Sequence, residues 1–309
     1  MSTLAVVTLE NLTVQYGRFT ALRDFSVAVP EGCVGLLGPN GAGKTTMLKT
    51  MLGFIKPAGG RGDVLGLEVG RDGMAIRQAV GYMPEQDCHI PGMNAVQFVA
   101  YAGELAGMPR NHAVRRAHEV LEYAGLGEAR YRAIESYSTG MKQRIKFAQA
   151  LVHGPKLLLL DEPTNGLDPK GRHEMLDLVR DISQNKGVNV LVCSHLLPDI
   201  ERTCDSVVVI AGGQMKLQGS VSDLRGLNSN AVDVELREKS GEFLQAAARH
   251  GFELVSAKGT WYRLAAVGGH EELSKKVFLA SREAGAQIRG LKPGARSLEE
   301  AFMEAIDVN

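Results

Sequence analysis

The chain has 309 residues, enough for two domains or for one large domain with an appendage. Hydrophobic residues make up 44% and charged residues 23%, and 35 basic residues balance 35 acidic ones, which disfavours a nucleic-acid or acidic-membrane surface because such surfaces usually carry a basic excess. No apolar stretch approaches the roughly 18 residues of a membrane span, the first residues lack a signal-peptide pattern, and the four cysteines are scattered, as expected of buried thiols in a reducing cytoplasm.

A glycine-rich loop is the most informative feature of the first part of the chain. Residues 4–30 predict short strands with turns, and the apolar run Cys33–Leu37 is typical of a buried strand. Residues 38–45 then read Gly-Pro-Asn-Gly-Ala-Gly-Lys-Thr, the pattern G-x-x-x-x-G-K-[ST]. Apolar residues at helical spacing follow from Thr46 to Phe54. Because a strand precedes the loop and a helix follows it, a chance match is disfavoured and the loop predicts nucleotide binding.

The chemistry of this loop explains its residue types. Glycines allow backbone N–H groups to approach a ligand, and the amino end of the following helix favours an anion. Lys44 is expected to reach the outer phosphates, and Thr45 is expected to hold Mg²⁺. The residues of this segment predicted to contact the nucleotide are Gly38, Asn40, Gly41, Ala42, Gly43, Lys44, Thr45 and Thr46.

The middle of the chain predicts a turn, a strand and then several helices. Residues 59–63 predict a turn into a strand at Val64-Leu65, and the pattern is helical from about 94 to 154, with Asn111 as an expected N-cap. Ser138 and Gly140 lie at the start of the last of these helices, where free N–H groups favour an anion. An ordinary serine N-cap would explain Ser138 equally well, so both interpretations stay open.

Two acids follow the next buried strand. Leu157–Leu160 run directly into Asp161 and Glu162, at the strand end where an α/β sheet places its ligand site. Asp161 suits Mg²⁺, and Glu162, expected on the opposite face of the strand, suits the activation of a water molecule. Two solvated acids are the alternative, which a neighbouring phosphate loop disfavours.

The rest of the chain predicts the remainder of the α/β sheet, followed by a linker and a separate group of strands and helices. A helix containing Met175, an apolar strand at 188–193 ending near His195, and a hairpin at Gly212-Gly213 complete an α/β sheet with a helical insertion. After a linker at 226–230, the pattern predicts a strand at 232–236, a strand pair around 261–264, and helices at 242–250, 271–284 and 297–306. The expected core of this part comprises Phe243, Leu244, Leu273, Val277 and Phe278.

Taken in order, four segments resemble the ATP-binding-cassette (ABC) ATPases over roughly residues 4–220. They are the phosphate loop, Tyr-Ser-Thr-Gly-Met-Lys-Gln-Arg from Tyr137, Leu-Leu-Leu-Leu-Asp-Glu-Pro-Thr-Asn-Gly-Leu-Asp-Pro from Leu157, and Val-Cys-Ser-His ending at His195. Thr139 and Met141 stand where the family most often has glycine and glutamine. This variant resembles cassettes that serve ABC-2-type exporters, as does the tail Ser-Leu-Glu-Glu-Ala-Phe at 297–302.

The resemblance implies an α/β fold: a P-loop NTPase (RecA-like) core with an antiparallel β subdomain and a helical subdomain, plus a small C-terminal α/β domain. The expected ATPase domain is 1–223, with its helical subdomain at about 87–154, and the accessory domain is 231–309. Whether the accessory domain regulates, dimerises, docks to a partner or only stabilises stays open.

The resemblance also implies a shared active site. In the family two cassettes meet head to tail, so Ser138 and Gly140 would contact the γ-phosphate bound by the partner. Tyr16 would stack on adenine, and His195 would hold the γ-phosphate and help to position water. The implied catalytic residues are therefore Lys44, Glu162 and His195.

The expected metal ligands are Thr45, Asp161 and Glu85. Glu85 stands where the family often has a glutamine, and Gln86 comes one place later. Either Glu85 takes that role or the loop shifts to present Gln86.

The resemblance implies an ATP-hydrolysing subunit, at the cytoplasmic face of the membrane, that powers an ABC-2-type exporter through a separate permease. It would use ATP and Mg²⁺ and act as a homodimer or a heterodimer, without nucleic acid. One alternative is a soluble ABC ATPase acting on ribosomes or nucleic acid, although such proteins usually carry two cassettes or a long coiled-coil insertion. An ABC importer subunit is the other, disfavoured by the tail domain and the signature variant.

Overall fold

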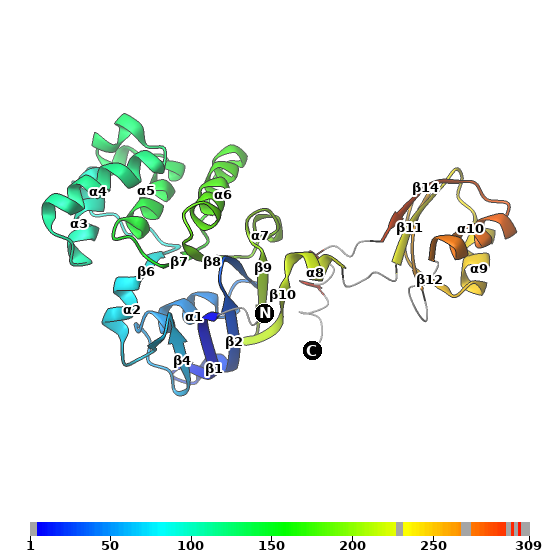
Figure 1. Ribbon diagram of the computed structural model, residues 1–309, viewed down its shortest axis with the longest axis horizontal. Helices are drawn as coiled ribbons and strands as arrows, with labels where there is room; N and C mark the ends of the chain where they lie inside the picture. Colours follow the sequence, from blue (N-terminus) through cyan, green and yellow to red (C-terminus); the bar gives the residue numbers. More distant parts are fainter. Residues whose placement is uncertain (1–4, 227–230, 267–272, 295–297, 300–301, 304–309) are drawn as a thin grey trace. The chain divides into compact units, whose positions relative to one another are not determined.

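The computed structural model describes residues 5–226, 231–266, 273–294, 298–299 and 302–303. The chain divides into two compact units, one ending at Val221 and the other beginning at Ser222 (Figure 1). Within the described ranges, no helix combines the length and the apolar character that crossing a bilayer needs.

The first unit begins with an antiparallel sheet in the order β2-β1-β4-β5. Its strands are β1 (Ala5–Tyr16), β2 (Phe19–Pro30), β4 (Gly59–Val64) and β5 (Leu67–Glu68). The predicted turn at 59–63 is wrong, because these residues form β4 and pair with β1, with Gly62 opposite Leu9. A Cβ atom on Gly60 would lie 2.3 Å from the carbonyl oxygen of Asn11, so glycine here permits close approach of two strands.

The second sheet of this unit has the order β10-β9-β3-β8-β7-β6. Its strands are β3 (Cys33–Leu37), β6 (Val80–Met83), β7 (Leu157–Asp161), β8 (Asn189–Ser194), β9 (Ser206–Ala211) and β10 (Gln214–Ser220). The five strands from β9 to β6 are parallel, and β10 is an antiparallel edge. Every residue of β3 and β7 is buried, as expected of parallel strands covered on both faces. Because β3, β8 and β7 are neighbours, their carboxyl ends lie side by side at one edge.

Among its described residues, the first unit has helices that pack against these sheets and helices that form a separate group. They are α1 (Lys44–Met51), α2 (Gly73–Ala79), α3 (Ala95–Leu105), α4 (Arg110–Tyr123), α5 (Thr139–Leu151), α6 (Pro169–Gln184) and α7 (Leu197–Thr203). Helices α3, α4 and α5 pack on one another (Figure 1), with two 3-10 turns, Gly127–Tyr131 and Ile134–Ser136, between α4 and α5. The N-cap prediction at Asn111 is wrong, because α4 already begins at Arg110 after Pro109, whereas Gly125 follows the helix end with a φ of 75°.

The second unit alternates strands and helices in the order β-α-β-β-α-β. After α8 (Val221–Gly226) come β11 (Ala231–Leu236), α9 (Gly241–Arg249), β12 (Phe252–Lys258), β13 (Trp261–Ala266), α10 (Leu273–Glu283) and β14 (Ile288–Pro293). The sheet order β12-β13-β11-β14, with every pair antiparallel, is that of a ferredoxin-like domain. The strand β14 was not predicted from the sequence.

The core of this second unit agrees with the sequence at most positions. Phe243 and Val277 are fully buried, and Leu244 and Leu273 pack against them. Phe278 is 56% exposed, so its prediction as core is wrong, since neighbouring residues on a helix point about 100° apart and Val277 takes the inward direction. Of the last predicted helix, Leu298, Glu299, Phe302 and Met303 are helical; the rest of 297–306 lies outside the described residues.

Candidate active site at the carboxyl edge of the parallel sheet

The phosphate loop connects β3 to α1 and lies against neighbouring backbone. Gly43, the N-cap of α1, has a φ of 108°. A Cβ atom on Gly38 would lie 2.3 Å from the carbonyl oxygen of Ile210 on β9, so only glycine fits there. The amino end of α1 borders a pocket of about 320 Å³, lined by residues 40–46 together with Tyr16, Phe19, Ala21, Glu85, Asp161 and Glu162. Residues 40–46 of the predicted contact segment therefore line this pocket, whereas Gly38 does not.

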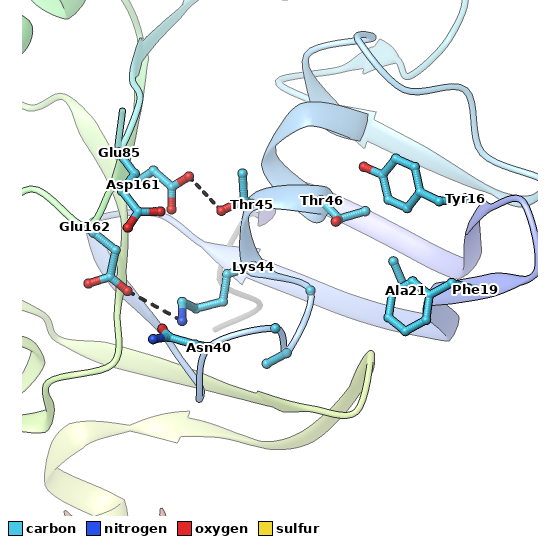
Figure 2. A pocket seen from close by; sticks show the side chains of 13 residues that line it. Tyr16, Phe19, Ala21, Asn40, Lys44, Thr45, Thr46, Glu85, Asp161 and Glu162 are labelled. Atoms are coloured by element: carbon cyan, nitrogen blue, oxygen red, sulfur yellow. Dashed lines mark hydrogen bonds and ion pairs between the residues drawn. The ribbon is translucent and has the colours of Figure 1, made fainter. Parts of the chain in front are cut away.

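A buried lysine and a buried glutamate meet in this pocket. Lys44 Nζ donates to the carbonyl oxygens of Gly38 at 2.7 Å and Pro39 at 3.3 Å. It lies 3.5 Å from Glu162 Oε1, and both side chains are 7% exposed. Figure 2 shows Lys44 and Thr45 pointing toward the acids at one end of the pocket, with Tyr16 and Phe19 at the other. The ammonium group of Lys44 is thus held beside the loop, where backbone N–H groups are suited to bind an anion.

The carboxylate of Asp161 lies beside the hydroxyl of Thr45. Thr45 Oγ1 donates to Asp161 Oδ2 at 2.8 Å. The other oxygen, Asp161 Oδ1, is buried without a hydrogen-bond partner among the described residues. Burial raises the pKa of Asp161, while the hydrogen bond from Thr45 opposes this. A buried carboxylate oxygen without a partner, next to a hydroxyl, fits a hard cation that prefers oxygen ligands, as Mg²⁺ does.

Glu85 supplies a third acid, from the segment after β6. It lines the pocket, whereas Gln86 does not. In the described ranges, no three acids, histidines or cysteines form a closed metal-binding group.

Glu162 also contacts His195, which follows β8. His195 Nδ1 lies 2.9 Å from Glu162 Oε2. The two acids were expected on opposite faces of a strand, which is wrong, because β7 ends at Asp161 and Glu162 has a φ of 51°. This left-handed backbone, which costs a non-glycine residue about 1–2 kcal/mol, brings both carboxylates to the same pocket.

A buried carboxylate fixes the segments that follow Glu162 and His195. Asp199 of α7 is 2% exposed and accepts from Thr164 Oγ1 at 2.6 Å and from Arg172 Nε at 2.5 Å. Thr164 comes two residues after Glu162, and Asp199 comes four residues after His195. This network therefore holds together the chain segments that carry the Glu162–His195 contact.

Ser138 and Gly140 do not line the pocket of their own chain. Ser138 is the N-cap of α5 and accepts from the backbone N–H of Met141 at 3.3 Å. Within one chain it therefore acts as an ordinary helix cap, one of the two interpretations that the sequence leaves open.

Two aromatic side chains border the far end of the pocket. Tyr16 and Phe19 are 49% and 63% exposed, and they pair across the β1–β2 hairpin. The sequence identified Tyr16 by resemblance but missed Phe19. The signal was the segment Tyr-Gly-Arg-Phe, in which a tight turn with a φ of 61° at Gly17 sets two aromatic residues opposite each other.

Comparisons with known proteins show which family this chain is similar to. The family described as ABC transporter matches residues 22–165. The Nod factor export ATP-binding protein I of Cupriavidus pinatubonensis (strain JMP 134 / LMG 1197) is 34% identical, covering 71% of this chain and 68% of that protein. The bacitracin transport ATP-binding protein BcrA of Bacillus licheniformis is 30% identical, covering 99% of this chain and 98% of that protein.

The fold is also similar to solved structures of ABC transporter cassettes. A dimeric structure of a bacterial ABC transporter cassette matches with a TM-score of 0.64 and 25% identity, covering 69% of this chain and 98% of that chain. The phosphate loop, the acids at the end of β7 and the histidine after β8 thus occur in a chain similar to proteins named for ATP binding in export or transport. The chain belongs to the ABC transporter family and is an ATP-binding subunit that hydrolyses ATP.

Proposed function

We propose that this subunit powers an exporter through a separate membrane permease, at the cytoplasmic face, using paired cassettes and Mg²⁺. The names of the two relatives, one for Nod factor export and one for bacitracin transport, support a transport role of this kind. The observation that carries the mechanism is the convergence of Lys44, Glu162 and His195 beside the Thr45–Asp161 pair.

Nucleotide binding uses the loop and the two aromatic side chains. Backbone N–H groups of the loop and the amino end of α1 receive the phosphate oxygens. Lys44 Nζ, held by two loop carbonyls, exchanges its contact with Glu162 for the outer phosphates. Tyr16 and Phe19 border the end of the pocket where a planar adenine can stack.

Thr45, Asp161 and Glu85 are the proposed groups around Mg²⁺. When bound, the ion supplies charge neutralisation on the phosphate oxygens. The Asp161 oxygen that has no partner among the described residues is the most direct support for this assignment.

Glu162 is the proposed general base. It accepts a proton from water as the water oxygen bonds to the γ-phosphorus and the bond from that phosphorus to the bridging oxygen breaks, giving ADP and phosphate. Because the Glu162 carboxylate has no proton to offer, His195 Nδ1–H is the donor in the 2.9 Å contact. That hydrogen bond orients the carboxylate and leaves His195 Nε2 directed away from it.

The partner cassette completes the site. Ser138, which is exposed, and Gly140, which is half-buried, lie at the amino end of α5 and would face the γ-phosphate bound by the other subunit. Closing of the dimer on ATP and opening after hydrolysis would then drive the permease.

Purification from a detergent extract tests the transport role. The tagged full-length chain, expressed in its natural host, is expected to bring down a polytopic membrane protein, with the Glu162→Gln variant as a trap for the closed dimer. Recovery of ribosomal RNA or DNA without any membrane protein would instead support the soluble ABC ATPase alternative.

Alanine at Tyr16 or Phe19 is expected to weaken nucleotide binding. Loss of one stacking partner costs about 1–3 kcal/mol, or roughly 5- to 150-fold in affinity. Equilibrium binding of fluorescent ATP, with ATP and GTP as competitors, measures the effect and its dependence on the base. Phe54, also exposed but outside the pocket, gives a matched control through Phe54→Ala, expected to bind normally. Normal affinity in both Tyr16→Ala and Phe19→Ala would show that these residues only pack.

A further inference from the structure

A lysine in the middle of α5 is completely buried. Lys146 has no exposed surface. Burial lowers the pKa of Lys146, and the carboxylate of Asp87 opposes that shift. Because a buried ammonium group is costly unless its N–H donors are satisfied, its contacts must be specific.

Those contacts are with the backbone of the segment that carries Glu85. Lys146 Nζ donates to the carbonyl oxygen of Pro84 at 3.0 Å and to that of Glu85 at 2.8 Å. Asp87 Oδ1 lies farther away, at 3.8 Å, and its side chain is 58% exposed. The lysine is therefore bound mainly to two consecutive carbonyl groups, and the ion pair is the weaker contact.

The same face of α5 also reaches the side chain of Glu85. Gln143, one helical turn before Lys146 and 5% exposed, donates from Nε2 to the carbonyl oxygen of Asn165 at 2.9 Å. Asn165 Nδ2 in turn donates to Glu85 Oε1 at 3.4 Å. Helix α5 thus holds the backbone of Glu85 directly and its carboxylate through one intermediate residue.

We propose that Lys146 is a positioning residue that holds Glu85 in the nucleotide pocket. Through this contact, α5 sets the position of Glu85 relative to the proposed Mg²⁺ site of the same chain. This rests on the proposed role of Glu85 near Mg²⁺. Since Ser138 caps the start of the same helix, a rotation of α5 on contact with the partner's nucleotide would move the two carbonyls that Lys146 holds. A purely structural lysine would stabilise the helix packing without affecting the metal requirement.

Replacement of Lys146 by methionine tests this positioning role. Lys146→Met keeps a flexible, unbranched side chain that is one atom shorter, and it removes the donors. We expect kcat to fall by about 10²-fold, the effect that a misplacement of roughly 1 Å can have. The Mg²⁺ concentration for half-maximal hydrolysis should rise, while ATP affinity measured in EDTA should stay within about twofold. The matched control is Lys142→Met, one turn earlier on α5, which removes another lysine near Asp87, at 3.8 Å, but no donor to Pro84 or Glu85.

A double-mutant cycle separates this inference from the proposed function. In a Glu85→Ala background, Lys146→Met should have no further effect on kcat or on the Mg²⁺ requirement. Additive effects, or a loss of ATP affinity in EDTA with a normal Mg²⁺ requirement, would overturn the positioning role. If Glu85→Ala alone is normal, the assignment of Glu85 itself fails.

A milder variant covers the case in which Lys146→Met does not fold. Lys146→Gln keeps N–H donors on a side chain one bond shorter and lacks the charge. An intermediate loss of kcat with a raised Mg²⁺ requirement is expected, and an unchanged Mg²⁺ requirement in a folded Lys146→Gln protein contradicts the proposal.

Discussion

Glu162→Gln is expected to bind ATP normally and to hydrolyse it about 10²–10⁴ times more slowly than the unmodified protein. The amide cannot accept the proton from water, and general-base catalysis contributes a factor of this size. The substitution keeps the shape of the side chain, and Gln Oε1 can still accept the hydrogen bond from His195 Nδ1 that Glu162 accepts at 2.9 Å. Single-turnover hydrolysis and nucleotide binding measured on the same preparation separate the chemical step from affinity.

The oligomeric state of this variant gives a second readout. Because ATP persists uncleaved, a dimer should accumulate at ATP concentrations that leave the unmodified protein mostly monomeric, as seen by size-exclusion chromatography with light scattering. Glu31→Gln, at an exposed acid before β3, should behave like the unmodified protein. Turnover of Glu162→Gln within a fewfold of normal would eliminate Glu162 as the base.

Lys44→Ala is expected to weaken ATP binding by roughly 10- to 100-fold. Hydrogen bonds to charged groups contribute about 1.5–3 kcal/mol each, and tenfold in affinity corresponds to about 1.4 kcal/mol. The lysine is held in place by the carbonyl oxygens of Gly38 and Pro39, so its charge is presented in one position. Isothermal titration with ATP in the presence and absence of Mg²⁺ measures the change.

The control for this variant is Lys49→Ala, at an exposed lysine on the same helix. The thermal stability of the variant should be measured in the same experiment. Removing Lys44 takes away the cation that faces the buried carboxylate of Glu162, and a buried charge without its partner destabilises the fold. Unchanged ATP affinity in folded Lys44→Ala would remove Lys44 from the phosphate site.

The parts of the site that the sequence predicted are short and local. The phosphate loop is continuous in sequence, and its residue types follow directly from backbone geometry and anion binding. Asp161 and Glu162 were found because a buried strand ends at them. For Tyr16 and Ser138 the sequence needed a family resemblance, since nothing local distinguishes them from a packed tyrosine or an ordinary cap.

The parts that it missed depend on contacts between distant segments. Phe19 matters because the β1–β2 hairpin brings it to the pocket, and Lys146 because it binds carbonyl groups about 60 positions earlier in the chain. The glycines of β4 predict a turn from the sequence, because glycine is common in turns, but in the structure they permit close packing of two strands. Whether Glu85 or Gln86 faces the nucleotide could not be decided from composition, and only Glu85 lines the pocket.

The left-handed backbone at Glu162 has a consequence for directed evolution of this chain. Glycine adopts that conformation without steric cost. A variant with glycine at position 162 would therefore have less backbone strain, but it would lack the proposed general base. Selection for heat resistance alone would therefore tend to erase turnover at this single codon. A library screened for robustness should keep position 162 fixed.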